Sequence, residues 1–132
     1  MQNELLSCAI RAALLAGKDI LNIYNDPKAD FAIERKADNS PLTIADKRSH
    51  ARIMDELDAT SIPVLSEEGR LTDYNIRKGW KTLWVVDPLD GTNNYSQGLP
   101  VFCVSIGLQY RGETLLGVVY APYLNELYTA IR

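Results

Sequence analysis

One stretch of the sequence decides the fold: Trp84-Val85-Val86-Asp87-Pro88-Leu89-Asp90-Gly91-Thr92. Its apolar start predicts a buried strand over 83–86, and Pro88 is expected to end that strand because proline fixes φ and lacks a ladder donor. Asp87 and Asp90 would then flank a sharp bend, where both carboxylates and the carbonyl of Leu89 can converge. Such an all-oxygen ligand set is the one that Mg²⁺ prefers.

The residue after the second aspartate favours an anion beside this metal. Gly91 lets the backbone approach a ligand without a Cβ in the way, and amides that point out of a turn form a concavity suited to phosphate. The alternative is purely structural. Asp-Pro and Asp-Gly are ordinary turn dipeptides, in which each carboxylate accepts hydrogen bonds from local amides.

A second acidic turn follows a second short apolar run, in the stretch Pro63-Val64-Leu65-Ser66-Glu67-Glu68-Gly69. Carboxylates gathered at one place repel one another, so a cation or a proton must offset them. We expect Glu67 to face inward, toward the first acidic turn. A solvated loop is the alternative for one of the two glutamates.

Together these residues resemble the Mg²⁺-dependent, lithium-sensitive phosphomonoesterases of the inositol monophosphatase superfamily. The resemblance rests on Asp-Pro-Leu-Asp-Gly-Thr at 87–92 directly after a strand, on the glutamate pair upstream, and on the segments 104–108 and 117–122 downstream. It implies that Glu67, Asp87 and the carbonyl of Leu89 hold one Mg²⁺, and that Asp87 and Asp90 share in a second.

The resemblance also implies how phosphate would be held and attacked. Thr92 and Glu67 would orient and deprotonate the attacking water, and the backbone amides of Gly91 and Thr92 would hold the phosphate. Two metals can stabilise the entering and the leaving oxygen of an in-line displacement, so no covalent enzyme intermediate is needed.

Two parts of the chain point to different members of the superfamily. The segments 36–46 and 62–70 are similar to the bacterial 3'(2'),5'-bisphosphate nucleotidases, which act on adenosine 3',5'-bisphosphate. The segment 93–100 is closer to inositol monophosphatases, since the nucleotidases are expected to have Lys-Glu-Phe after Asp-Gly-Thr. We favour the nucleotidase, with inositol-1-monophosphatase as the alternative. The alternative of another class is a non-catalytic, metal-binding fragment.

A third acid, Asp46, has both a structural and a functional interpretation. Thr43 is expected to cap a helix, with Asp46 three residues on to answer the cap amide and complement the helix dipole. The resemblance instead places Asp46, with Lys36 and Asp38, at a loop that closes over the site. It implies that Asp46 has a catalytic role and helps to hold a third ion, and that Lys36 contacts the substrate. His50, in the same helix, is expected at the surface.

The remaining pattern predicts an α+β fold. Apolar residues recur at helical spacing over 6–24 and again over 53–57, and strands are expected over 101–110, 115–120 and 126–131, with a hairpin turn at 111–113. Two N-terminal helices packed on an antiparallel sheet make one domain over 1–132, not a doubly wound fold. By resemblance it is the N-terminal half of the layered α/β/α/β/α sugar phosphatase fold, with the C-terminal half absent.

Composition limits the partners. A net charge of −3 gives no electrostatic footprint for nucleic acid or an anionic membrane, so the expected partner is a small phosphorylated metabolite. Cys8 and Cys103 are expected as small core residues rather than a disulfide. No leader and no bilayer-length apolar run is seen, so we expect a cytoplasmic protein. The face left open by the missing half is expected to favour a homodimer.

Overall fold

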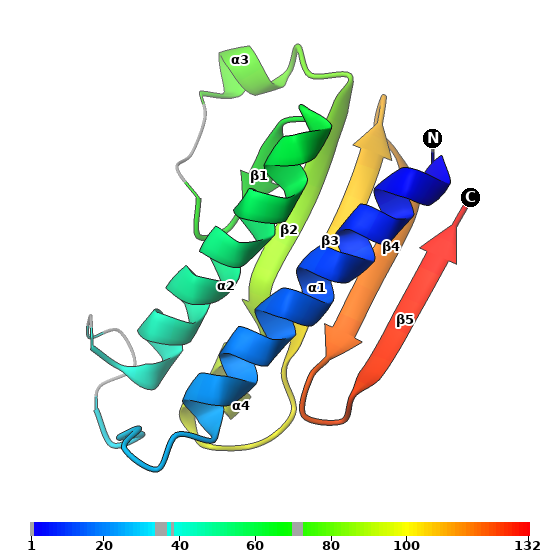
Figure 1. Ribbon diagram of the computed structural model, residues 1–132. Coiled ribbons are helices and arrows are strands. Elements are labelled where there is room, and N and C mark those ends of the chain that lie inside the picture. Colours follow the sequence, from blue (N-terminus) through cyan, green and yellow to red (C-terminus); the bar gives the residue numbers. More distant parts are fainter. Residues whose placement is uncertain (1, 34–36, 38, 70–72) are drawn as a thin grey trace.

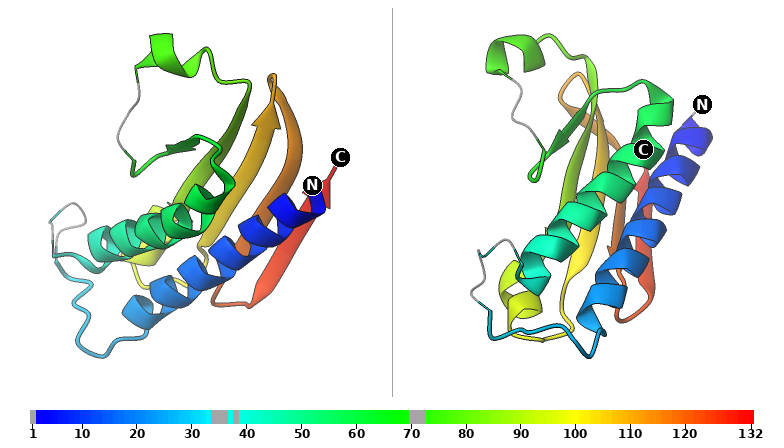
Figure 2. Two further views of the ribbon diagram at one scale, coloured as in Figure 1. Left: turned by 45° about the horizontal axis from the view of Figure 1, so that its top comes forward. Right: turned by 60° about the vertical axis from the view of Figure 1, so that its left-hand side comes forward.

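The computed structural model describes residues 2–33, 37, 39–69 and 73–132. Two long helices of opposite direction lie on one side of a five-stranded sheet (Figures 1 and 2). None of the helices that the structure describes is both long and apolar enough to cross a membrane. In chain order the elements are α1 (Gln2–Tyr24), α2 (Pro41–Leu57), η1 (Asp58–Thr60), β1 (Val64–Ser66), α3 (Tyr74–Arg77), β2 (Thr82–Asp90), α4 (Thr92–Ser96), β3 (Cys103–Tyr110), β4 (Glu113–Ala121) and β5 (Glu126–Ile131).

The sheet is mixed, with the order β1-β2-β3-β4-β5. The predicted α+β class and the packing of two helices on a sheet are confirmed, and β2 to β5 form the expected antiparallel ladder. The prediction of a wholly antiparallel sheet was wrong at one edge, because β1 pairs with β2 in parallel, Ser66 opposite Val86. The long connection over 67–81 makes this possible, since a parallel pair needs a crossover of such length.

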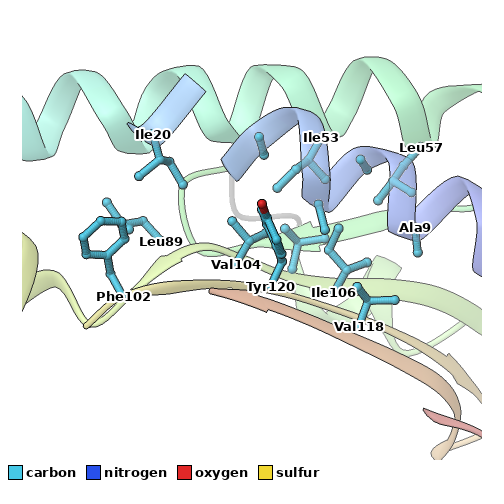
Figure 3. Packing of buried hydrophobic residues seen from close by; sticks show 14 of the residues in the cluster. Ala9, Ile20, Ile53, Leu57, Leu89, Phe102, Val104, Ile106, Val118 and Tyr120 are labelled. Carbon is cyan, nitrogen blue, oxygen red and sulfur yellow. The ribbon is translucent and has the colours of Figure 1, made fainter. Parts of the chain in front are cut away.

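The core lies between the two helices and the sheet (Figure 3). Helix α1 presents small residues to the core, and a Cβ at Gly17 would come within 2.5 Å of the Tyr120 ring. Glycine therefore allows the helix to approach β4 closely. Larger side chains fill the rest of the layer, among them Ile53 and Leu57 from α2 and Ile106 and Val118 from the sheet.

Helix α2 begins earlier than the sequence pattern predicted. Its N-cap is Ser40, whose Oγ accepts a hydrogen bond from the Thr43 amide at 3.1 Å, with Pro41 as the first helical residue. Proline suits that position because its φ is already helical and the missing N–H would have no partner there. The prediction of Thr43 as the cap was therefore wrong, and Asp46 lies beyond the first turn, where it cannot answer the cap amide.

Strand β2 does not end at Pro88. It continues to Asp90 through a register shift, in which Asp87 lies opposite Ser105 and Asp90 opposite Cys103. Two residues of β2 thus face one of β3, which is a β-bulge. Pro88 is tolerated inside the strand because a bulge does not require its ladder donor, and the prediction that it ends the strand was wrong.

Candidate metal centre

The two acidic turns meet at one edge of the sheet. Because β1 and β2 are parallel, both strands deliver their following residues to the same end (Figure 1). The Glu67 amide donates to the Val86 carbonyl at 3.3 Å, directly before Asp87. The side chain of Glu67 is exposed, but it lies close enough to Asp87 for its charge to act on that carboxyl and for the two carboxyl groups to share a hydrogen bond. The structure thus places Glu67 and Asp90 close enough to Asp87 for their charges to act on its carboxyl.

The bulge sets the backbone around the two aspartates. The Leu89 amide donates to Asp87 Oδ1 at 3.3 Å, and the Gly91 amide donates to Asp90 Oδ1 at 2.9 Å. These are the local contacts that an ordinary turn would make. The side chain of Leu89 is 2% exposed and anchors the segment in the core.

Electrostatics distinguish this turn from an ordinary one. Burial, then repulsion from Glu67 and Asp90, raises the pKa of the Asp87 carboxyl to about 6, and a hydrogen bond in which protonated Asp87 donates to the Glu67 carboxylate adds to the rise. The Leu89 amide opposes it. A carboxylate held against two others is the arrangement that a bound cation would relieve.

The oxygen atoms of these residues are suitable ligands for a hard cation, although the protein alone does not supply a full set of ligands. Within the described ranges, no three acidic, histidine or cysteine side chains are gathered as a full metal cluster. Mg²⁺ does not need such a cage, because it keeps several waters and is commonly bound by one or two carboxylates together with substrate phosphate. Asp87 with either neighbouring acid meets that requirement.

Gly91 is required by the shape of the turn. Its φ is +86°, and a Cβ there would lie 2.7 Å from the Val101 carbonyl oxygen. It precedes α4, which opens at Thr92 and is fixed by the buried Tyr95, whose hydroxyl reaches the Ile20 carbonyl at 3.4 Å. The segment that the resemblance assigns to phosphate therefore leads into a helix that is anchored in the core through Tyr95.

An open cleft of about 310 Å³ adjoins Asp90 and Gly91. Its wall is mainly apolar, with Phe102, Val119 and Leu124 among the lining residues. No local sequence pattern predicts this cleft, because its walls come from the end of β2, from α4 and the loop that follows it, from β3 and β4, and from the β4–β5 turn. Cys103 also lines it, and its Sγ lies 4.0 Å from Asp90 Oδ2.

Two further candidate residues, Asp46 and His50, lie on α2. Asp46 is close enough to Tyr95 for its charge to add to the effect of burial, which raises the pKa of that phenol. Lys36 and Asp38 lie outside the described residues. His50 is half-buried and its Nδ1 lies 3.0 Å from Ser66 Oγ, so the expectation of a plain surface histidine was wrong.

Comparisons with known proteins show which family this chain is similar to. The model of the inositol monophosphatase family matches residues 1–132. The chain is 44% identical to the 3'(2'),5'-bisphosphate nucleotidase CysQ of Shigella flexneri, over 87% of this chain and 47% of that protein. It is 41% identical to the Nus factor SuhB of Pasteurella multocida, over 98% of this chain and 48% of that protein.

A solved structure extends the comparison to three dimensions. The crystal structure of CysQ from Bacteroides thetaiotaomicron matches with a TM-score of 0.93 and 50% identity, over 98% of this chain and 46% of that one. The chain spans about half the length of the relatives that it matches.

Proposed function

The chain belongs to the inositol monophosphatase family, and from that premise we propose that it carries part of a Mg²⁺-dependent phosphomonoesterase site. The observation that carries this proposal is the meeting of two acidic strand ends, which leaves Asp87 half-buried and close to the charges of Glu67 and Asp90. An arrangement that costs the folded protein stability is explained if it binds a cation.

Four groups would hold the metal. Glu67, Asp87 and the Leu89 carbonyl would form one site, and Asp87 and Asp90 would share in a second. When bound, such ions lower the pKa of a coordinated water and offset the negative charge of a phosphate group. The number of ions, two or three, stays a prediction from the resemblance.

The protein groups around that site have separate tasks. The exposed carboxylate of Glu67 would accept a proton from the attacking water, and the Thr92 hydroxyl would orient that water. The amides of Gly91 and Thr92 would hold the phosphate. The Gly91 amide now donates to Asp90, so this contact has to open when phosphate takes its place.

Asp46 and Lys36 complete the proposal. Asp46 lies on α2, near α4. This position supports a role close to the phosphate and does not support a role as a helix cap. Lys36, assigned to substrate by the resemblance, lies outside the described residues, and its contact stays a prediction.

The substrate that we favour is adenosine 3',5'-bisphosphate. The CysQ relatives and the segments 36–46 and 62–70 support it. A second candidate is inositol 1-phosphate, favoured by the segment 93–100, whose pattern is similar to inositol monophosphatases. A cytoplasmic location and a homodimer also stay predictions from the sequence.

Phosphate release from both substrates, with and without Mg²⁺, tests this proposal. We expect the wild-type chain to release phosphate preferentially from the bisphosphate, Asp90→Asn to abolish release, and Glu68→Gln to leave it unchanged. Glu68 is the matched control because it adjoins Glu67 and is exposed, yet it does not contribute to the pKa shift of Asp87. Mg²⁺ binding without turnover on either substrate would instead support the non-catalytic fragment.

A further inference from the structure

Helix α2 contacts both acidic turns through two consecutive residues. Ser49 Oγ donates to the Pro88 carbonyl at 2.7 Å, and His50 Nδ1 lies at hydrogen-bond distance, 3.0 Å, from Ser66 Oγ. Pro88 lies between the two aspartates of β2, and Ser66 directly precedes Glu67. One helix therefore bonds to the backbone of one turn and to the side chain at the start of the other.

The contact to β2 satisfies a buried group in the bulge. Ser49 is fully buried, and Pro88 lies where the register of β2 against β3 shifts. A buried carbonyl without a hydrogen-bond partner destabilises the folded state. The Ser49 hydroxyl therefore holds the bulge in the conformation that presents Asp87 and Asp90.

The contact to β1 holds the second turn. Ser66 is 7% exposed, and its carbonyl accepts a hydrogen bond from the Gly69 amide at 3.1 Å, which closes the turn around Glu67. A Cβ at Gly69 would lie 3.3 Å from His50 Cε1 and 3.4 Å from Ser66 Cβ. The imidazole thus packs against both ends of the turn and limits how it can move.

The two contacts are separate from the one that ties α2 to α1. That tie includes the ion pair of Arg52 with Asp19, at 2.8 Å. Neither of its members belongs to an acidic turn, so it attaches the helix without touching the proposed metal centre. The chain thus offers a matched contact on the same helix.

We propose that Ser49 and His50 are positioning residues, which set the distance between Glu67 and the Asp87–Asp90 pair. This inference rests on the proposed function, since it needs a cation to be bound there. Removing either contact loosens one turn relative to the other. Groups that orient the ligands of a metal commonly change its affinity about 10-fold or more.

Calorimetric titration of the chain with Mg²⁺ alone is the first test. We expect Ser49→Ala and His50→Ala each to weaken binding about tenfold. His50→Asn should recover most of the affinity, because the amide nitrogen of asparagine can occupy the position of Nδ1. Arg52→Ala is the control and should bind like the wild type. Urea denaturation of each variant establishes that it is folded.

Amide hydrogen exchange in EDTA gives a second readout, which needs neither metal nor substrate. The Gly69 amide reports on the β1 turn and the Leu89 amide on the bulge. His50→Ala should speed exchange at Gly69, and Ser49→Ala should speed it at Leu89, each leaving the other probe unchanged.

The outcomes separate this inference from the proposed function. Unchanged Mg²⁺ affinity in both alanine variants overturns the positioning role, whether or not exchange is faster. Weaker binding with both probes unchanged also overturns it, since the effect would not pass through the turns. If the wild-type chain itself binds no Mg²⁺, the proposed metal centre fails and this inference fails with it.

Discussion

Replacing Asp87 by asparagine should stabilise the metal-free protein at neutral pH. The folded state raises the pKa of this carboxyl from 3.8 to about 6, through burial and the charges of Glu67 and Asp90. By linkage, that rise corresponds to a destabilisation of about 3 kcal/mol once the group is ionised. Partial exposure of the side chain reduces the effect to about 1–2 kcal/mol. Asparagine cannot ionise, and its Oδ1 can still accept the Leu89 amide.

The sign of the pH dependence follows from the same values. Because the folded-state pKa is the higher one, the folded protein binds more protons than the unfolded chain between about pH 4 and pH 6. The carboxyl's contribution to stability therefore falls as the pH rises through this window and is constant above it. The difference between Asp87→Asn and the wild type should be near zero at about pH 4 and reach its full value by about pH 7.5.

Urea denaturation in EDTA at these two pH values measures the effect. Asp55→Asn is the matched control, because it removes an exposed carboxylate of α2 and should change stability little at either pH. Adding Mg²⁺ should stabilise the wild type more than Asp87→Asn. An Asp87→Asn protein that is less stable than the wild type at neutral pH, or a difference that does not vary with pH, would refute the reasoning.

Two further predictions concern the turn and the sheet. Gly91→Ala should destabilise the chain by about 1–3 kcal/mol in urea denaturation, because φ is +86° and the new Cβ would lie 2.7 Å from the Val101 carbonyl; wild-type stability would contradict the observed turn. The sheet also exposes apolar side chains, among them Val85 and Val119, which are 37% and 38% exposed. If these faces pair in a homodimer, Val119→Lys should yield monomers in light scattering, and an unchanged mass would exclude this face as the interface.

Local signals in the sequence predicted most elements. Helical spacing was expected over 6–24 and α1 ends at Tyr24, and the hairpin turn expected at 111–113 includes Arg111 and Gly112, both with positive φ. The start of α2 was missed although Ser40-Pro41 is itself a start signal, because Thr43 with Asp46 offered a competing cap. The helix starts at Ser40-Pro41 rather than at Thr43, because proline is tolerated in the first turn of a helix but not further inside it.

Contacts between distant residues could not be predicted in this way. Ser49 and the Pro88 carbonyl are 39 residues apart, and His50 and Ser66 are 16 apart. No sequence signal near any of these four residues indicates which residue it will contact. The bulge that keeps Pro88 inside β2 likewise depends on β3, which follows later in the chain.

The parallel pairing of β1 with β2 is the decisive contact of this kind. Had the two strands paired in antiparallel fashion, Glu67 would lie near the start of β2, at the opposite end from Asp87 and Asp90. Each acidic turn would then be an ordinary solvated loop, and the pKa of Asp87 would lack its largest repulsive contribution, that of Glu67. The residue types in the two turns indicate the candidate ligands, but the direction of the short strand β1 decides whether those ligands lie close enough to bind one cation.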